Sequence, residues 1–180
     1  MIDGEKNLIE RAIKGEASAF GLLYDKYQPQ IYRFIYLKVG HREEAEDLTH
    51  QVFLKTWGNI DRYNFQGFPF SSWLYRVARN QVIDFYRTKK ANLSLESINI
   101  TELKIESFNS GEIDVNPDIE RIKKAIHQLN LRQQDVIILR FIEDFSLAEV
   151  ASILNKTETA VKLIQHRALK KLKKIINHQS

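Results

Sequence analysis

The side chains best suited to chemistry lie near the C-terminal end of the chain, where cations recur along a predicted helix. The stretch 156–174 holds seven basic residues against a single acidic one, Glu158. Apolar residues recur every three or four positions from Val161, so we expect that row to be buried and the basic row to be exposed. Ammonium and guanidinium groups in such a row bind phosphates and base edges. The pattern predicts a nucleic-acid contact, although a solvated charged face would look similar.

A short helix with a clear N-terminal signal precedes the basic helix. Ser146 and Glu149 have the spacing of a capping box, in which each side chain accepts a hydrogen bond from the other residue's backbone amide. Asn155 suits a left-handed turn, and Thr157 can cap the second helix. Two helices joined in this way predict a helix-turn-helix, whose second helix enters the major groove of DNA. A helical hairpin with a basic solvent face is the alternative.

A second group of side chains combines aromatic rings and cations around a break in the helical pattern. The segment 62–70 contains Gly67 and Pro69 and is predicted as a loop. Flat rings stack on unpaired bases, and cations bind the backbone of a separated strand. Burial of the rings in a core is the competing interpretation, because that is the commoner position of aromatic residues. The group consists of Tyr63, Phe65, Phe68, Phe70, Trp73, Arg76, Arg79 and Asn80.

No residue pattern in the chain indicates catalysis. The five histidines lack metal-ligand spacing and the sequence has no cysteine, so we predict no metal site and no cofactor. Neither a glycine-rich phosphate loop nor a nucleophile elbow occurs in the sequence. We therefore expect that the protein has no catalytic residues and is not an enzyme.

The elements that must position these groups are predicted to be helices. Only three prolines and seven glycines occur in 180 residues, too few for an all-β chain with frequent turns. The helical period runs from residue 7 to residue 39, and Pro29 is expected to interrupt it or to open a new helix over 31–39. Ser71 or Ser72 is expected to cap a helix that ends near residue 89. The other predicted helices cover 43–57, 118–128, 131–143, 146–154 and 157–177.

Charge and composition divide the chain into two all-α domains joined by a linker. Residues 1–90 carry a net charge of +3 and residues 118–180 a net charge of +5, whereas residues 91–117 carry −4 and lack helical periodicity. Two basic blocks around an acidic connector favour two surfaces that face a polyanion. The sequence shows neither an apolar signal core nor a run long enough to span a membrane, so we expect a cytoplasmic protein without membrane insertion.

Three motifs, in this order, resemble those of bacterial RNA polymerase sigma factors of the extracytoplasmic-function (ECF) group, in the sigma-70 family. They are AEDLTHQVFLKTW at 45–57, FSSWLYRVARNQVIDFYRTKK at 70–90, and a long segment at 129–172 that contains the helix-turn-helix. The resemblance implies that region 2, over 1–90, binds the clamp helices of the largest subunit of core RNA polymerase and holds the melted minus-ten element. It implies that region 4, over 118–180, reads the minus-thirty-five element as duplex. It also implies an anti-sigma factor that clamps both domains.

The resemblance assigns residues to each of these surfaces by position. The core polymerase would contact Asp47, Leu48, His50, Gln51 and Leu54. The minus-ten strand would contact Arg62, Tyr63, Asn64, Phe65, Trp73, Arg76, Arg79 and Asn80. The minus-thirty-five duplex would contact Thr157, Thr159, Lys162, Leu163, His166, Arg167 and Lys170. Phe53 and Trp57 are expected to be mostly core residues.

The sequence departs from the family's usual pattern at a few of these positions. His50 and Gln51 stand where the family often has Gln-Glu, which removes one acidic group from the expected polymerase contact. Asn155 replaces the usual glycine of the turn. Ile164 occupies a position that is commonly basic and outward, whereas the apolar period turns it inward, and its orientation stays open at this point.

Two other classes of protein compete with this interpretation. A stand-alone helix-turn-helix regulator would use its N-terminal half as a sensor or dimerisation domain, and would bind duplex DNA tightly without polymerase. A helical adaptor that binds only protein would leave the basic helix unexplained. The aromatic and basic helix over 70–90 favours the sigma-factor interpretation, because it suits single-stranded DNA better than ligand sensing.

Overall fold

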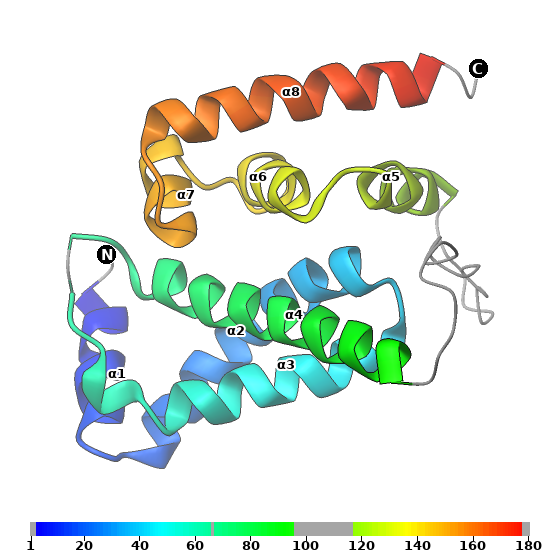
Figure 1. Cartoon of the computed structure of the whole chain (residues 1–180). Helices are drawn as coiled ribbons and strands as arrows, with labels where there is room; N and C mark the ends of the chain where they lie inside the picture. The colour runs from blue at the N-terminus through cyan, green and yellow to red at the C-terminus, as the bar shows by residue number, and fades with distance from the viewer. Residues whose placement is uncertain (1–2, 66, 96–116, 178–180) are drawn as a thin grey trace.

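The computed structural model describes residues 3–65, 67–95 and 117–177, and these ranges fold into α-helices and one short 3-10 helix (Figure 1). The all-α prediction is therefore confirmed. The N-terminal half contains α1 (Asp3–Ile13), α2 (Ala17–Val39), α3 (Arg42–Trp57), η1 (Ile60–Arg62) and α4 (Phe70–Leu95). The C-terminal half contains α5 (Pro117–His127), α6 (Leu131–Phe141), α7 (Leu147–Leu154) and α8 (Glu158–Asn177).

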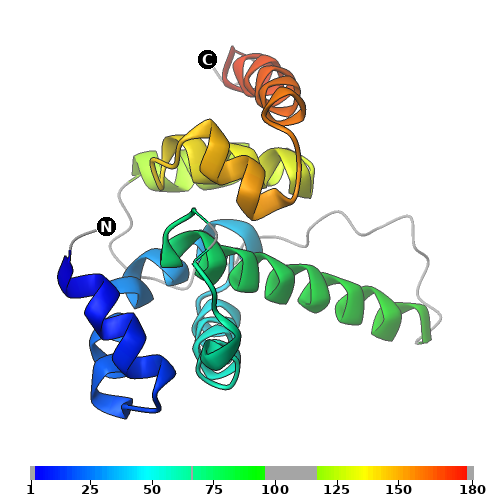
Figure 2. The same ribbon diagram turned by 90° about the vertical axis from the view of Figure 1, so that its left-hand side faces the viewer.

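Helix α2 is the central element of the N-terminal half and contacts α1, α3 and α4. Its apolar stripe includes Ile31, Phe34 and Ile35, which are fully buried. Figure 2 shows α1 lying against the first part of α2, and α3 nearly end-on beneath α4. The helix ends as predicted at Gly40, whose positive φ of 82° lets its backbone N–H donate to the Tyr36 carbonyl at 2.9 Å.

Helix α2 runs through Pro29 without a break, so the predicted interruption is wrong. A proline inside a helix removes one backbone donor and crowds the preceding turn, which costs about 3 kcal/mol. Leu23 and Tyr27 before the proline and Ile31 after it are all buried in the same core. Because each such burial contributes roughly 1.5–3 kcal/mol, keeping both segments in one helix outweighs the penalty.

Helix α4 begins at Phe70, ahead of the two serines predicted to cap it, and continues to Leu95. The cap prediction is wrong because Ser72 already lies in the first turn, where its backbone N–H donates to the Pro69 carbonyl at 3.0 Å. Its buried hydroxyl has no hydrogen-bond partner among the described residues. Phe70, which is 1% exposed, packs its ring on Tyr27 and so fixes the start of the helix.

The C-terminal half is a compact group of helices around α6. A capping box that the sequence analysis did not anticipate starts this helix, in which Asn130 Oδ1 accepts from the Gln133 amide at 3.0 Å and Gln133 Oε1 accepts from the Asn130 amide at 3.3 Å. Helix α6 contacts α2, α7 and α8, and its buried side chains include Val136, Ile138 and Leu139.

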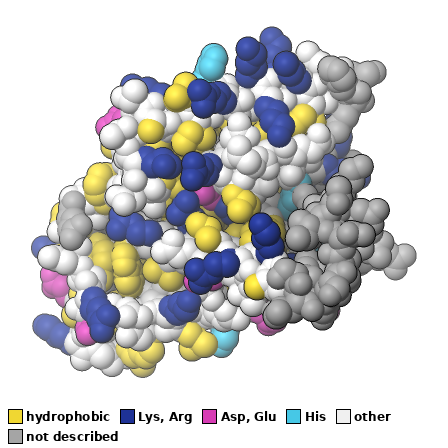
Figure 3. Space-filling view, in the orientation of Figure 1, with side chains coloured by type: hydrophobic (Ala, Val, Ile, Leu, Met, Phe, Trp, Pro, Cys, Tyr) yellow, Lys and Arg dark blue, Asp and Glu magenta, His cyan; other side chains and the backbone are white. Residues whose placement is uncertain are grey.

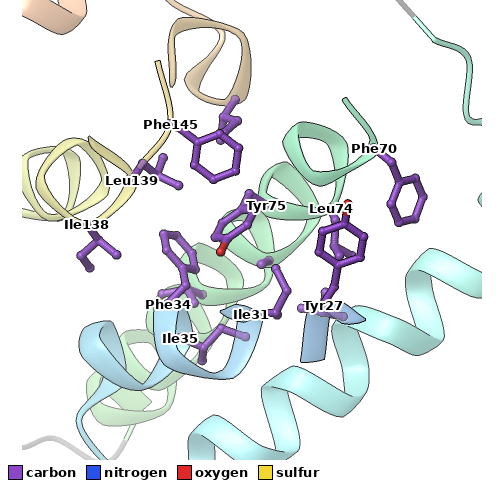
Figure 4. Packing of buried hydrophobic residues seen from close by; sticks show 14 of the residues in the cluster. Tyr27, Ile31, Phe34, Ile35, Phe70, Leu74, Tyr75, Ile138, Leu139 and Phe145 are labelled. Atoms are coloured by element: carbon purple, nitrogen blue, oxygen red, sulfur yellow. The ribbon is translucent and has the colours of Figure 1, made fainter. Parts of the chain in front are cut away.

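The two halves share one hydrophobic core, which sequence periodicity did not predict (Figure 4). The ring of Tyr75 on α4 lies edge-to-face against Phe34 of α2, with 5.3 Å between ring centroids. It makes the same type of contact, at 4.9 Å, with Phe145 between α6 and α7. Of the linker predicted over 91–117, residues 91–95 belong to α4 and Pro117 begins α5, whereas residues 96–116 lie outside the described residues.

None of the described helices is long and apolar enough to cross a membrane. Within the same ranges, no three His, Cys, Asp or Glu side chains are grouped so that they could hold a metal ion.

Candidate nucleic-acid interface

The helix-turn-helix predicted at the C-terminal end is present as α7 and α8. Ser146 Oγ accepts from the Glu149 amide at 3.2 Å, and Glu149 Oε2 accepts from the Ser146 amide at 2.8 Å, which confirms the capping box. Asn155 adopts the left-handed conformation with φ of 50°. Thr157 Oγ1 accepts from the Ala160 amide at 3.2 Å and caps the first turn of α8. All three local predictions are confirmed, and together they set the direction of α8.

The basic face of α8 is exposed, and its apolar face is buried. Val161 and Ala168 are fully buried, and Ile164 packs against the core from a partly buried position. The position of Ile164 settles the open question in favour of the apolar period. Figure 3 shows basic side chains gathered over α8 at the top of the molecule. The residues assigned to duplex DNA are all exposed: Thr157, Thr159, Lys162, Leu163, His166, Arg167 and Lys170.

The loop before α4 carries two candidate stacking rings, of which Tyr63 is packed against other rings and Phe65 is exposed. Tyr63 packs edge-to-face on Phe70 at 5.3 Å between centroids and contacts Trp73 at 5.4 Å. Burial raises the pKa of the Tyr63 phenol, and its oxygen has no hydrogen-bond partner among the described residues. The ring of Phe65, in contrast, is 56% exposed. Core packing therefore explains Tyr63 and Trp73, and Phe65 is the exposed ring.

Polar groups that could complete a strand contact lie in this loop and on the helix that follows it. Arg62 and Asn64 are exposed beside Phe65, and Asn80 is exposed on α4. Gly67 allows the chain to turn here, because its φ of 84° is strained for residues with a side chain.

Two arginines of α4 that were assigned to the melted strand are engaged by the C-terminal half. Arg76 Nη2 donates to the Ser152 carbonyl at 2.9 Å and to its hydroxyl at 3.2 Å. Arg79 Nε donates to Asp135 Oδ2 on α6 at 2.8 Å. Arg76 and Arg79 thus join α4 to α7 and α6 and are not free cations.

Sequence reasoning missed two further cations on α2 that have partners in the C-terminal half. Lys38 is fully buried and forms an ion pair with Asp135, which is itself 1% exposed. Burial lowers the pKa of Lys38, and the attraction of Asp135 opposes this shift. Arg33 Nη2 donates to Glu143 Oε2 at 2.7 Å. The available signal was a charge inside an apolar run, since Lys38 interrupts YLKV and Asp135 precedes VIIL.

The side chains assigned to polymerase lie on α3 and divide into exposed and buried groups. Leu48 is 4% exposed and packs in the core, so it supports the helix and cannot itself form a contact surface. Leu54, at 57%, is an exposed apolar side chain. Phe53 and Trp57 pack against aromatic rings of α2, as expected. The remaining assigned residues are exposed: Asp47, His50 and Gln51.

Comparisons with known proteins match both halves of the chain. The model of Sigma-70 region 2 matches residues 23–92, and the model of Sigma-70 region 4 matches residues 125–174. The chain is 36% identical over 177 residues to the ECF RNA polymerase sigma factor BldN of Streptomyces coelicolor, with 94% of this chain covered. The chain spans 64% of the length of that protein. It is 30% identical over 178 residues to the ECF RNA polymerase sigma factor SigW of Bacillus subtilis, covering 94% of this chain and 95% of SigW.

Solved structures show the same fold. CnrH, in complex with the cytosolic domain of CnrY, superposes with a TM-score of 0.75 at 23% identity, covering 99% of this chain and all of that one. The sigma factor RpoE of Bartonella quintana, in complex with the anti-sigma factor NepR, gives a TM-score of 0.70 at 23% identity, with 88% and 96% covered.

Proposed function

The chain belongs to the ECF group of the sigma-70 family of RNA polymerase sigma factors, and from this premise we propose how it directs polymerase to promoters. Region 4 would hold the minus-thirty-five duplex, while region 2 would bind polymerase and the melted minus-ten strand. The family is non-enzymatic, so the polymerase supplies the chemistry of RNA synthesis. The observation that carries the proposal is the exposed basic face of α8, which follows α7 in a helix-turn-helix whose two helices are both capped.

Duplex recognition is assigned to the first turns of α8. Lys162, Arg167 and Lys170 are exposed cations that can reach phosphates or base edges in a major groove. Thr157 and Thr159 stand at the N-terminal end of the helix, where backbone amides and the helix dipole also favour phosphate.

Strand capture is assigned to the loop before α4. An extruded base needs a ring for its face and polar groups for its edge. Phe65 supplies an exposed ring, Asn64 and Asn80 supply exposed amides, and Arg62 supplies an exposed cation. Arg76 and Arg79 would hold strand phosphates once they are released from their present partners. Trp73 and Tyr63 would support the loop from behind, since both are packed rings.

Polymerase binding is assigned to the exposed edge of α3. Asp47, His50 and Gln51 offer polar contacts around the apolar side chain of Leu54, which is 57% exposed. We expect this surface to meet the clamp helices of the largest polymerase subunit. A complex with polymerase and chromosomal DNA would place the protein in the cytoplasm.

An anti-sigma factor is a further expected partner. The Bartonella quintana sigma factor with this fold was solved in complex with the anti-sigma factor NepR. Sigma factors of this family bind RNA polymerase and promoter DNA. We expect a protein of the anti-sigma class to hold this chain away from polymerase.

The test is reconstitution with core RNA polymerase, followed by genome-wide run-off transcription on fragmented chromosomal DNA. The proposal expects defined transcripts that appear only when the chain is present. A stand-alone regulator would instead protect duplex sites without polymerase, and an adaptor would do neither.

A further inference from the structure

Glu5 on α1 is a carboxylate that is turned towards the protein rather than towards solvent. Its side chain is 12% exposed, whereas the side chain of Glu10 on the same helix is 57% exposed. Helix α1 precedes the residues that the two family models match, which begin at residue 23, and the function proposed above gives it no part. Because burying a carboxylate is costly unless it is paired, the partners of Glu5 show what this helix holds in place.

Both partners of Glu5 lie on α2. Glu5 Oε1 accepts a hydrogen bond from the Tyr27 hydroxyl, and Glu5 Oε2 forms an ion pair with Lys26 Nζ at 3.1 Å. The Lys26 side chain is 45% exposed, so water screens the ion pair, whereas Tyr27 is 5% exposed. A phenol hydroxyl lies at the end of a rigid ring, so a hydrogen bond to it fixes the direction of the whole Tyr27 side chain.

Tyr27 is the first of four aromatic rings in contact, and the last of them belong to the loop before α4 and to α4 itself. Its ring packs on Phe70 with 5.8 Å between centroids, and Figure 4 shows both side chains at the start of α4. Phe70 lies edge-to-face on Tyr63 at 5.3 Å, and Trp73 contacts Phe70 at 5.6 Å and Tyr63 at 5.4 Å. We refer to these four residues as the ring row. It connects the carboxylate of Glu5 to the segment that carries the exposed ring of Phe65, two residues after Tyr63.

A second connection between α1 and the loop runs through η1, which contacts α1 directly. Ile60 in η1 is 4% exposed, and its carbonyl accepts a hydrogen bond from the Tyr63 amide at 3.0 Å. Burial, followed by the charge of Glu5, raises the pKa of the Tyr63 phenol, as expected for two groups that lie near each other. The backbone and the ring of Tyr63 are therefore both held by elements that pack on α1.

We propose that Glu5 is a positioning residue for strand capture, because its hydrogen bond with Tyr27 orders the ring row on which the loop before α4 rests. The proposal rests on the function proposed above, in which Phe65 stacks on an unpaired base. A loop that is ordered before binding loses less conformational entropy when its ring meets the base. Glu5 acts through the ring row and does not itself contact the strand.

Substitutions on α1 and α2 separate positioning from stability. Glu5→Ala removes both contacts and is the main variant, and Tyr27→Phe removes only the hydroxyl and keeps the ring. Glu5→Gln is the conservative variant, since its amide oxygen can still accept from the Tyr27 hydroxyl. Glu10→Ala makes the same change as the main variant on an exposed side chain of α1. Ile9→Val is the control for lost packing of α1, because Ile9 is 4% exposed and lies in the core.

The first measurement is the motion of the loop in the full chain. The sequence has no cysteine, so Asn64→Cys places a single nitroxide label at an exposed position beside Phe65. The electron paramagnetic resonance spectrum of this label should show a rotational correlation time shortened about twofold by Glu5→Ala and by Tyr27→Phe. The spectra of Glu5→Gln, Glu10→Ala and Ile9→Val should match that of the otherwise unchanged chain. A merely structural role of Glu5 would lower the melting temperature, as Ile9→Val does, without freeing the label.

The second measurement is promoter melting by the reconstituted holoenzyme, on a promoter recovered by the run-off transcription described above. Permanganate reactivity of unpaired thymines should fall about fivefold with Glu5→Ala, which is within the contribution of one stacked base. Binding to core polymerase and to the minus-thirty-five duplex should stay normal. Glu5→Gln should recover most of the reactivity, and Glu10→Ala should lose none. If Glu5→Ala fails to fold, Tyr27→Phe tests the same hydrogen bond from its other side.

A freer label together with weaker melting in Glu5→Ala and Tyr27→Phe, and recovery of both readings in Glu5→Gln, supports the positioning role. Phe65→Ala is measured in parallel to separate this role from strand capture itself. An unchanged label or normal melting in Glu5→Ala and Tyr27→Phe, where Phe65→Ala melts poorly, overturns the positioning role and leaves strand capture in place. Equal losses in Glu5→Gln and Glu5→Ala overturn it as well. If Phe65→Ala melts promoters normally, the loop has no part in strand capture and the positioning role fails with it.

Discussion

The two basic surfaces of the molecule differ in how their charges are satisfied. On α8, the cations extend into solvent, and the buried side chains are the apolar Val161 and Ala168. On α2 and α4, four cations are engaged by carboxylates and a carbonyl from the other half of the chain; these α2/α4 cations are Arg33, Lys38, Arg76 and Arg79. We expect the first surface to accept a rigid duplex directly, and the second to bind a strand only after it is uncovered. This difference fits the order of events at a promoter, where duplex binding precedes strand separation.

The largest effect is expected on the free energy of unfolding, and it concerns the covered cations of α2 and α4. Asp135→Leu should lower the free energy of unfolding by about 3–5 kcal/mol, because it leaves Lys38 buried without its partner. Adding Lys38→Met should recover most of that loss, since apolar side chains of similar size replace a buried pair at little cost. Urea denaturation of both variants measures the effect. Additive losses would contradict the coupling between these two residues.

The second prediction compares the exposed ring of Phe65 with the packed ring of Tyr63 in the loop before α4. Phe65→Ala should weaken promoter melting by roughly 1–3 kcal/mol, the stacking contribution of one base, without a change in thermal stability. Permanganate reactivity of unpaired thymines measures melting. Tyr63→Phe is the control, because it removes only a hydroxyl that has no described hydrogen-bond partner, and it should melt promoters normally. Normal promoter melting by the Phe65→Ala variant would show that this ring does not stack on a promoter base.

Local sequence signals predicted the helix-turn-helix surface well, but they failed to predict how the other surface is covered. Ser146, Asn155 and Thr157 act through neighbours a few positions away, so their spacing was sufficient. The pair of Lys38 and Asp135 joins residues 97 positions apart, and no local pattern encodes such a contact. Pro29 was misjudged for the same reason, because burial on both sides of it is a tertiary effect.

On α8, we expect single substitutions to act on DNA affinity alone. Arg167→Ala should weaken binding to the minus-thirty-five duplex by about 1–3 kcal/mol if its guanidinium contacts a base edge. Lys162→Ala should lower the affinity for the duplex by a smaller amount. It should mainly reduce the salt dependence of binding, as expected for the loss of a phosphate contact. Titration of the holoenzyme on promoter duplex at several salt concentrations distinguishes the two. Unchanged affinity and salt slope in both variants would exclude α8 as the reading helix.

On α3, reversal of an exposed charge should affect assembly with polymerase more than folding. Asp47→Lys is expected to weaken binding to core polymerase by about 1 kcal/mol or less, because a charge at the rim of an interface acts mostly on the association rate. Glu10→Lys makes the same change on α1 and should assemble normally. Stopped-flow association with labelled core polymerase measures both rates, and equal rates would remove Asp47 from the contact.

The smallest expected effect lies far from both surfaces, at the turn between α1 and α2. Arg11 and a hydrogen bond from Ser18 lower the pKa of Glu16 to about 2. A lowered carboxyl pKa stabilises the fold above its ordinary pKa, and this contribution is lost as the pH falls from about 4.5 towards 2. Because the pair is exposed, Glu16→Gln should shift the melting temperature only slightly at pH 7. The shift should vanish near pH 2, and a constant difference across this range would contradict the assignment.

The comparison of the two basic surfaces is tested most directly by energy transfer during stepwise assembly. The chain has no cysteine, so Lys14→Cys and Lys173→Cys, at exposed positions in opposite halves, can carry a donor and an acceptor dye. We predict that promoter duplex carrying only the minus-thirty-five element binds the closed chain and leaves energy transfer unchanged, because the α8 cations are already exposed. Addition of core polymerase and a melted minus-ten strand should then lower energy transfer as the halves separate. High energy transfer that persists in the complete open complex would show that the α2/α4 cations stay covered, and would contradict the account.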